Sequence, residues 1–539
     1  MKHAFDFDRR CSGLLLHLTS LPGPHHSGDL GEQAYRFVDF LARAKQTWWQ
    51  MLPVSPPSAP PGSSPYSSYS AFAGSPWLIS IERLVEDGLL DRADVAIHSS
   101  SRQSRRRDAA GDFRRSISYR LPRLGKAFEN FRSRRSGQEA FEFFCEAQKS
   151  WLDDYALFGA LMDANRGRPW SRWSTDLRLR KPDALRSARN QLAESVAFHQ
   201  FLQYEFDRQW LALRSYAAQR GVGLIGDIPI FVAFDSSDVW AHRSLFLLDA
   251  SGRPRAQSGY PPDPFNSHGQ AWGHPHYDWA AHDSTGYQWW VARFAANYRW
   301  FDAARIDHFL GFQRAWHIAG GARDARRGRW VAGPGARLFQ ALRSALGRTP
   351  IIAEDLGLLT REASLLRDQF RFPGMRVIQF GFGTGGDYHL PHRYPNRCVA
   401  YTGTHDNATI VGWFRKLRQS ATGNRRAEIQ KVLRYLHTRG SEIHWDMIRS
   451  LMASVADTVI FPAQDVLGLG DRDRMNIPGT PVGNWRWRLK PDQLTNEHAY
   501  RLAELCDLFD RQSVAPIRRV GKRATATSAA SRRASSISA

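Results

Sequence analysis

The sequence predicts an α/β fold, a (β/α)8 TIM barrel with large insertions after strands 2 and 3, and three observations support this prediction. Eight short apolar runs recur along the 539 residues, each ending in polar or turn residues. Helical patterns lie between them, and two connections are far too long for simple crossovers. Near-continuous apolar runs are typical of parallel strands buried on both faces, and their alternation with helices favours a barrel.

The eight predicted strands are the apolar runs 13–21, 48–54, 222–232, 303–309, 350–357, 375–383, 398–406 and 457–469. Between them, apolar residues recur at the spacing of one helix face. The clearest case is 31–45, whose apolar positions are Ala34, Phe37, Val38, Phe40 and Leu41. Similar patterns occur in 288–301, 336–347 and 361–370. We therefore expect these four segments to be helices that cover the barrel.

The two long connections suggest the domain organisation. Residues 55–221 follow the second strand and carry helical patterns of their own, so we expect an insertion subdomain at about 81–220. A segment rich in Gly, Pro, Ser, His and Trp follows the third strand, which predicts a substrate-loop insertion at about 234–285. The catalytic barrel with its insertions would span 1–517, and the basic segment 518–539 would be a disordered tail.

The formal net charge of +22 raises the alternative of a nucleic-acid-binding protein. Part of the excess is local, in the Arg-rich segments 101–116 and 518–539. A nucleic-acid surface interleaves basic with aromatic residues, and neither segment contains Trp or Tyr. Solvated basic segments therefore explain the charge better, and we expect no nucleic-acid partner.

The cysteines and the first apolar run indicate a cytoplasmic protein. Cys11, Cys145, Cys398 and Cys506 lie far apart, without the spacing of a metal site or the density of a disulfide framework. The run 13–21 lacks a small-residue cleavage site, so we expect neither a signal peptide nor a membrane span. No dinucleotide fingerprint, P-loop or calcium loop occurs, and we expect no cofactor and no metal. A monomer and a homodimer both remain open.

Four carboxylates stand where predicted strands end: Asp227 in the third, Asp307 in the fourth, Glu354 in the fifth and Asp406 in the seventh. Reactive groups of such barrels come from the C-terminal ends of strands, so these side chains would converge on one mouth. Four acids in one place repel one another and need counter-charges. Candidates are Arg305, His308 and His405.

Glycosyl transfer would give these carboxylates a common purpose, although each alone is more simply a helix cap or an ion-pair partner. Its transition state resembles an oxocarbenium ion, which nearby negative charge stabilises. A retaining mechanism needs one carboxylate as nucleophile and a second carboxyl as acid and then base. The acid needs a raised pKa, which burial and neighbouring carboxylates supply.

Longer blocks make the interpretation specific. RIDHF (305–309), AEDLG (353–357) and YTGTHDN (401–407) resemble blocks of the amylomaltases, the disproportionating 4-α-glucanotransferases of the α-amylase clan. The similarity covers most of the chain and keeps its order. The further matching blocks are SGLLLHLTSLPGP (12–24), SPYSSYSAFAGSP (64–76), GDIPIFVAFDSSDVWAH (226–242), GYPPDPFNSHGQAWGHPHY (259–277), PGMRVIQF (373–380), QDVLGLGDRDRMNIPGT (464–480) and GNWRWRL (483–489).

This resemblance implies three catalytic carboxylates. Asp307 would be the nucleophile that forms a β-glucosyl-enzyme, and Glu354 would be the acid/base. Asp406 would hold substrate hydroxyls and stabilise the transition state without bonding covalently. Asp355, beside Glu354, would point to the opposite side of the strand and is not expected to be catalytic.

The resemblance also implies a set of substrate-binding residues. Arg305 would orient Asp307 and keep it ionised, and the two histidines would donate hydrogen bonds to sugar hydroxyls. Tyr66 would stack on a glucose ring with Ser64 beside it, while Asn476 would contact sugars further out. The complete expected set is Arg305, His308, His405, Asp227, Tyr66, Ser64, Gln270, Trp272 and Asn476.

Three positions depart from the family pattern: Leu310 stands where many relatives carry Arg, Ala408 where Asp is common, and Ser27 where an aliphatic residue is usual. None of them removes a catalytic acid. The expected reaction is α-1,4-glucan transfer to the 4-hydroxyl of a glucan or glucose acceptor. An α-glucan hydrolase is the alternative, because the same carboxylates serve both, and a non-catalytic glucan- or nucleic-acid-binding protein is a third possibility.

Overall fold

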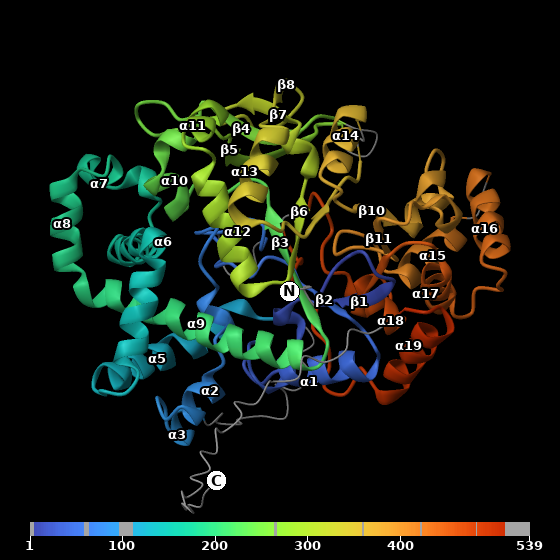
Figure 1. Ribbon diagram of the computed structural model, residues 1–539, viewed down its shortest axis with the longest axis horizontal. Coiled ribbons are helices and arrows are strands. Elements are labelled where there is room, and N and C mark those ends of the chain that lie inside the picture. The colour runs from blue at the N-terminus through green and yellow to red at the C-terminus, as the bar shows by residue number, and fades with distance from the viewer. Residues whose placement is uncertain are drawn as a thin grey trace, which may run out of the picture.

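The computed structural model describes residues 5–58, 64–95, 111–262, 267–357, 360–420, 423–480 and 482–511. Eight parallel strands form a closed barrel at its centre (Figure 1). They are β1 (Cys11–Leu15), β2 (Trp48–Gln50), β3 (Gly223–Pro229), β6 (Ala303–Asp307), β9 (Ile351–Ala353), β10 (Gly374–Val377), β11 (Cys398–Tyr401) and β12 (Thr458–Pro462). Each lies within or overlaps one of the eight expected runs, so the predicted fold class is confirmed.

The strands follow chain order around the barrel, and β12 closes it by pairing with β1, with Cys11 opposite Thr458. The helices with an apolar face cover the outside. They include α1 (Glu32–Arg43), α12 (Gln288–Trp300), α13 (Ala336–Leu346), α14 (Arg361–Gln369), α15 (Ile410–Gln419), α17 (Ile443–Ala453) and α19 (Asn496–Leu508), while α16 (Asn424–Tyr435) packs against α15. The four expected helices are therefore present, and α1 buries the five apolar residues of its predicted face.

A helical insertion separates β2 from β3. It contains α2 (Ile81–Glu86), α3 (Arg92–Val95), α5 (Phe113–Arg132), α6 (Gln138–Ala164), α7 (Thr175–Arg178), α8 (Pro182–Gln191) and α9 (Ala193–Gln219). The long helix α9 packs against α6 at one end of the insertion and against α1 and α12 of the barrel. It thus also serves as the crossover helix that leads into β3, as Figure 1 shows.

A second sheet lies above β6 in Figure 1 and has the strand order β5-β4-β7-β8. β4 (Ala256–Tyr260) and β5 (Gln270–Pro275) come from the expected insertion after the third barrel strand. β7 (Arg314–Ala319) and β8 (Gly328–Ala332) come from a further insertion, after the fourth strand, that the sequence pattern did not reveal. The two insertions pair antiparallel, β4 with β7, and so form one structure.

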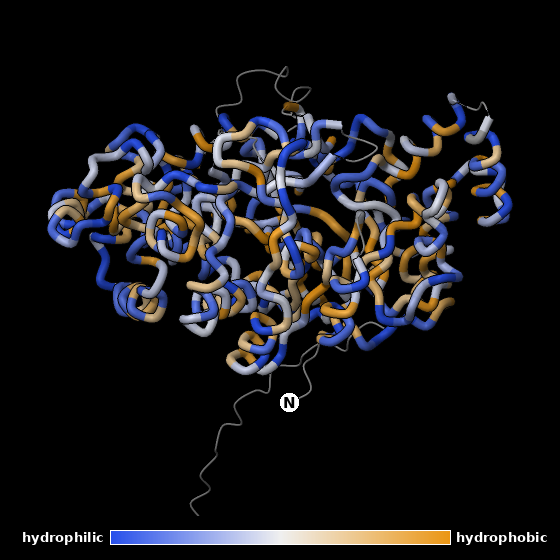
Figure 2. The backbone as a smooth tube through the Cα atoms, turned by 90° about the horizontal axis from the view of Figure 1, so that it is seen from above, coloured by the Kyte–Doolittle hydropathy of each residue, from blue (hydrophilic) through white to orange (hydrophobic). Residues whose placement is uncertain are grey.

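Figure 2 shows hydrophobic segments gathered inside the molecule and hydrophilic ones around its edge. Most of the nineteen Trp side chains are structural, because eleven are buried: Trp48, Trp49, Trp170, Trp173, Trp210, Trp240, Trp289, Trp290, Trp300, Trp445 and Trp487. The remaining short helices are α10 (Ser237–Ala241), α11 (Trp279–Ser284) and α18 (Ala463–Val466). Within the described ranges, no helix is long and apolar enough to cross a membrane. The expected tail, 518–539, lies outside the described residues.

Candidate active site

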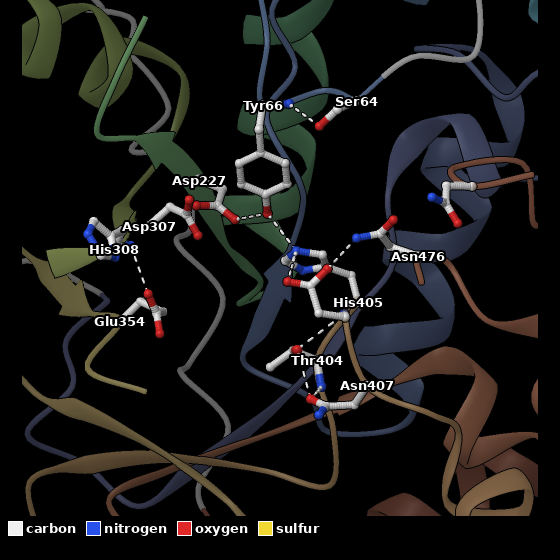
Figure 3. Close-up of polar contacts among 12 residues, drawn as sticks. Ser64, Tyr66, Asp227, Asp307, His308, Glu354, Thr404, His405, Asn407 and Asn476 are labelled. Carbon is white, nitrogen blue, oxygen red and sulfur yellow. Dashed lines mark hydrogen bonds and ion pairs between the residues drawn. The ribbon is translucent and has the colours of Figure 1, made fainter. Parts of the chain in front are cut away.

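A cavity of about 470 Å³ opens at the C-terminal ends of the barrel strands. The expected residues that line it come from loops distant in sequence, and Figure 3 shows most of them facing a common space. They are Ser64, Tyr66, Gln270, Trp272, Asp307, His308, Glu354, His405, Asp406 and Asn476. Asp227 and Arg305 are absent from this lining. The barrel therefore brings together all three carboxylates that we expect to be catalytic.

Arg305 lies beneath the cavity and holds two carboxylates. Its side chain is only 5% exposed, and its Nη2 donates to Asp307 Oδ1 at 3.0 Å. Its Nη1 contacts both oxygens of Asp227 at 2.9 and 2.8 Å. Alternation along β6 places residues 305 and 307 on the same, inward face, and β3 sets Asp227 opposite Arg305. Arg305 thus contacts the candidate nucleophile directly and does not reach the sugar space.

Asp227 also lies beneath the cavity, at 5% exposure, instead of beside the expected sugar. Burial raises its pKa, and Arg305 opposes that effect. The hydroxyl of Tyr66 donates to Asp227 Oδ2 at 2.7 Å and lies 3.0 Å from His405 Nε2. These contacts fix the Tyr66 ring between the two sides of the site, as Figure 3 shows.

Glu354 follows β9 and is held by backbone groups. The N–H of His308 donates to Oε2 at 2.8 Å, and the N–H of Leu356 donates to Oε1 at 2.9 Å. His308 adopts the left-handed conformation, with φ of 54°, immediately after Asp307. Burial raises the pKa of Glu354 to about 7, with a contribution from the charge of Asp307 and against the opposing effects of Arg305 and the two N–H donors. The carboxyl can therefore hold a proton near neutral pH.

Asp406 has the opposite electrostatic environment. Burial alone would raise its pKa, but the charge and hydrogen bond of His405, and the amide of Asn476, hold the pKa of Asp406 well below its usual range. His405 Nε2 lies 3.4 Å from Oδ2, and Asn476 Nδ2 donates to Oδ1 at 2.6 Å. Burial disfavours the charged form of His405, yet Asp406 raises its pKa overall. Asp406 is therefore a fixed negative charge at the cavity.

Aromatic side chains form part of the cavity wall. Trp272 on β5 lies edge-on to the His308 ring at 5.0 Å, and its indole N–H donates to Gln270 Oε1 at 3.1 Å. The rings of Tyr66 and His405 stack at 5.3 Å, with Trp485 about 6 Å from both. Trp485 was not among the expected residues, although a Trp in the Gly- and Asn-rich stretch GNWRW is a visible signal for a loop aromatic.

The cavity has further lining residues that we did not expect from the sequence, and they include His274, Thr480 and Asn484. Asp355 does not line the cavity, because it pairs with Arg367 and accepts a 2.7 Å hydrogen bond from the N–H of Met375. Among the described residues, no cluster of His, Cys, Asp or Glu side chains could hold a metal ion. At the cavity, Glu354 offers a carboxyl that can hold a proton near neutral pH, and Asp406 offers a fixed negative charge.

Comparisons with known proteins agree with this geometry. A sequence model of a family described as 4-alpha-glucanotransferase matches residues 16–495. The 4-alpha-glucanotransferase of Synechocystis is 45% identical over 94% of this chain and 99% of its own length, and that of Thermus thermophilus is 44% identical over 93% and 99%.

Among solved structures, the amylomaltase from Streptococcus agalactiae, determined with acarbose, superposes with a TM-score of 0.87 at 36% identity. The match covers 94% of this chain and all of that one. The amylomaltase from Corynebacterium glutamicum shares the fold, with a TM-score of 0.75 at 19% identity. Family match, relatives and structure lead to one conclusion: the chain belongs to the 4-alpha-glucanotransferase family, the amylomaltases, and is a glycosyltransferase acting on α-1,4-glucans.

Proposed function

We propose that this chain transfers α-1,4-glucan segments by a retaining double displacement in which Asp307 is the nucleophile. Its carboxylate attacks the anomeric carbon, forming a β-glucosyl ester as the glycosidic C–O bond breaks. Glu354 gives its proton to the departing 4-oxygen. The observation that supports this assignment is the contrast between the two groups: Arg305 pairs with Asp307, while burial raises the pKa of Glu354 to about 7.

The second displacement reverses these roles. Glu354, now a carboxylate, takes the proton from the 4-hydroxyl of an acceptor glucan or glucose, and that oxygen attacks the ester carbon. A new α-1,4 bond forms, Asp307 is released, and Glu354 is again protonated. Asp406 stays ionised throughout, so it can bind ring hydroxyls and favour the oxocarbenium-like charge of both transition states.

The cavity wall suits a glucan chain, whose sugar rings present apolar C–H faces and hydroxyl edges. Tyr66, Trp272 and Trp485 offer aromatic surfaces, and His308 and His405 offer hydrogen-bond partners. Ser64 and Gln270 would contact hydroxyls at the rim. Because an aromatic wall can hold an acceptor sugar and displace water, we favour transfer over hydrolysis. A protein that only binds a glucan or a nucleic acid would not need a proton-holding carboxyl beside a nucleophile.

We also propose that the enzyme works in the cytoplasm on soluble maltodextrins and on polysaccharide ends. The four cysteines, Cys11, Cys145, Cys398 and Cys506, are free thiols, which suits a reducing compartment. The mechanism takes its reacting groups from one chain, so it can operate in a monomer or in a homodimer.

Incubation of the pure protein with maltotriose tests the proposed reaction. Transfer converts it into glucose and longer maltodextrins while the total number of reducing ends stays constant. A steady rise in reducing ends would identify a hydrolase. Asp307→Asn should remove turnover while the folded state is retained, as judged by circular dichroism, and a fully active variant would overturn the nucleophile assignment.

A further inference from the structure

The segment 402–410 joins β11 to α15 and carries His405 and Asp406 in its middle. A single carboxylate outside the cavity lining holds both ends of this segment. Asp465 Oδ2 accepts a 2.6 Å hydrogen bond from the Thr402 hydroxyl, and Oδ1 accepts a 2.8 Å hydrogen bond from the N–H of Ile410. One side chain thus spans the ends of the catalytic loop.

Asp465 belongs to α18, a short helix that follows the last barrel strand, β12. It is 2% exposed, and Thr402 is completely buried. Burial raises the pKa of Asp465 to about 6, and the hydrogen bonds from Thr402 and Ile410 oppose this effect. Among the described residues, no cationic side chain forms an ion pair with it. The charged form therefore depends on these two donors and on the positive N-terminal end of α15, where Ile410 is the first residue.

Other residues form hydrogen bonds with the middle of the segment. Gln379 Nε2 donates to the carbonyl of Ala408 at 2.8 Å, and Arg474 Nη2 donates to the carbonyl of Asp406 at 2.8 Å. The N–H of Asn476 donates to the carbonyl of His405 at 3.0 Å. These bonds hold the middle of the segment, as do the hydrogen bonds of Thr404 with Asn407. Among the described residues, Asp465 is the one side chain that forms hydrogen bonds with both Thr402 and Ile410.

We infer that Asp465 is a positioning residue for transfer: by bridging Thr402 to Ile410 it sets the distance and direction between β11 and α15, and so places the carboxylate of Asp406 and the ring of His405 against the substrate. The residue acts through Asp406, so this inference rests on the proposed role of Asp406. A buried carboxylate that has only neutral hydrogen-bond donors destabilises the folded state, because its charge is removed from water without an opposite charge beside it. The positioning of the segment 402–410 explains why a carboxylate stands at this buried site.

Replacement of Asp465 by Asn tests the inference, because the amide keeps the shape but has one acceptor oxygen for two donors. If the Thr402 hydroxyl turns to accept from the amide instead, the carboxylate charge beside the N-terminus of α15 is still lost. With maltotriose, we expect kcat to fall about 100-fold, the size of effect that a displacement of about 1 Å causes in a catalytic group. KM should change less than about threefold, since the aromatic wall is untouched. Wild-type kcat in a folded Asp465→Asn protein would overturn the inference.

A milder pair of variants covers the case in which Asp465→Asn does not fold. Thr402→Val removes one of the two hydrogen bonds and should lower kcat about 10-fold. Thr402→Ser keeps the hydroxyl and should stay within about twofold of wild type. A buried position that matters only for packing predicts the reverse order, since Val retains the volume and Ser does not, and that order would overturn the inference.

Asp207→Asn is the matched control for loss of a buried carboxylate. Asp207 lies on the outer helix α9 and is 5% exposed. It accepts hydrogen bonds from Arg299 and from the indole of Trp300, both on α12. This variant should lower the unfolding temperature with kcat unchanged at 20 °C. If Asp465→Asn loses activity only in proportion to its own unfolding, the inference fails. The product profile of the wild-type enzyme with maltotriose tests the proposed function separately, because it does not depend on the kcat of any variant.

Discussion

The substitution Asn476→Ala distinguishes two roles of Asn476: contact with outer sugars, or support of the Asp406 carboxylate. The resemblance placed Asn476 beside sugars further out, whereas its amide donates to Asp406 Oδ1 at 2.6 Å. A hydrogen bond to a charged group contributes about 1.5–3 kcal/mol. The Asp406 side chain is 45% exposed towards the cavity, so solvent screening favours the lower half of that range. About 1.5–2 kcal/mol corresponds to a loss of roughly 10- to 30-fold in kcat/KM.

The assay compares maltotriose with maltoheptaose as donors. If Asn476 acts by holding Asp406, the loss appears mainly in kcat and is the same for both donors, because both use the same transition state. If Asn476 instead binds outer sugars, KM rises with the longer donor and maltotriose is little affected. A purely chain-length-dependent KM effect would refute the role that the geometry assigns.

Three further predictions concern charge, burial and the cavity wall. Because Glu354 must be protonated to release the leaving group and its pKa is raised to about 7, kcat/KM should fall about tenfold per pH unit above that value, and a rate that stays level to pH 9 would contradict the assignment. Protonated Glu354 also favours the folded state, so its contribution to stability is lost as the pH rises through about 7. Arg305→Met leaves the buried Asp227 without its cation and should cost about 3–5 kcal/mol of unfolding free energy in urea titrations at pH 8. The cost should fall as the pH is lowered, because burial raises the pKa of Asp227 and a protonated carboxyl needs no cation; a cost that does not change with pH would count against this account. Trp485→Ala should raise KM for maltotriose roughly 2- to 12-fold with kcat retained, the range for one aromatic contact, and an unchanged KM would remove Trp485 from the substrate wall.

The barrel could be predicted because each strand is a short apolar run that stops at a polar residue. Asp307, Glu354 and Asp406 were visible for the same reason, since strand ends mark the barrel mouth. Strand β7 was missed because its partner β4 lies more than fifty residues away in the chain, and such long-range pairing leaves no local sequence signal. Strand β8 pairs with β7 alone and was missed together with it. The contact of Asn476 with Asp406 could not be predicted, because it spans seventy residues of chain.

The structure explains one of the three departures from the family pattern through the hydrogen bonds of a buried side chain. Ser27 is 1% exposed, and its hydroxyl lies 2.9 Å from that of Ser116 on α5, which in turn bonds the buried Arg120. A residue that looked out of place in sequence is therefore satisfied by a helix of the insertion. Leu310 is 8% exposed and packs as an apolar residue, and nothing in the structure explains the preference for Ala at position 408.

The central claim is a covalent intermediate on Asp307, and trapping it is the most direct test. In Glu354→Gln, an α-maltosyl fluoride donor can still react, because fluoride leaves without a proton, while the second step lacks its base. Mass spectrometry of the quenched and digested protein should then find one maltosyl unit on the peptide that contains Asp307. An adduct on Asp406 instead, or rapid consumption of the donor with no adduct on any peptide, would contradict the mechanism.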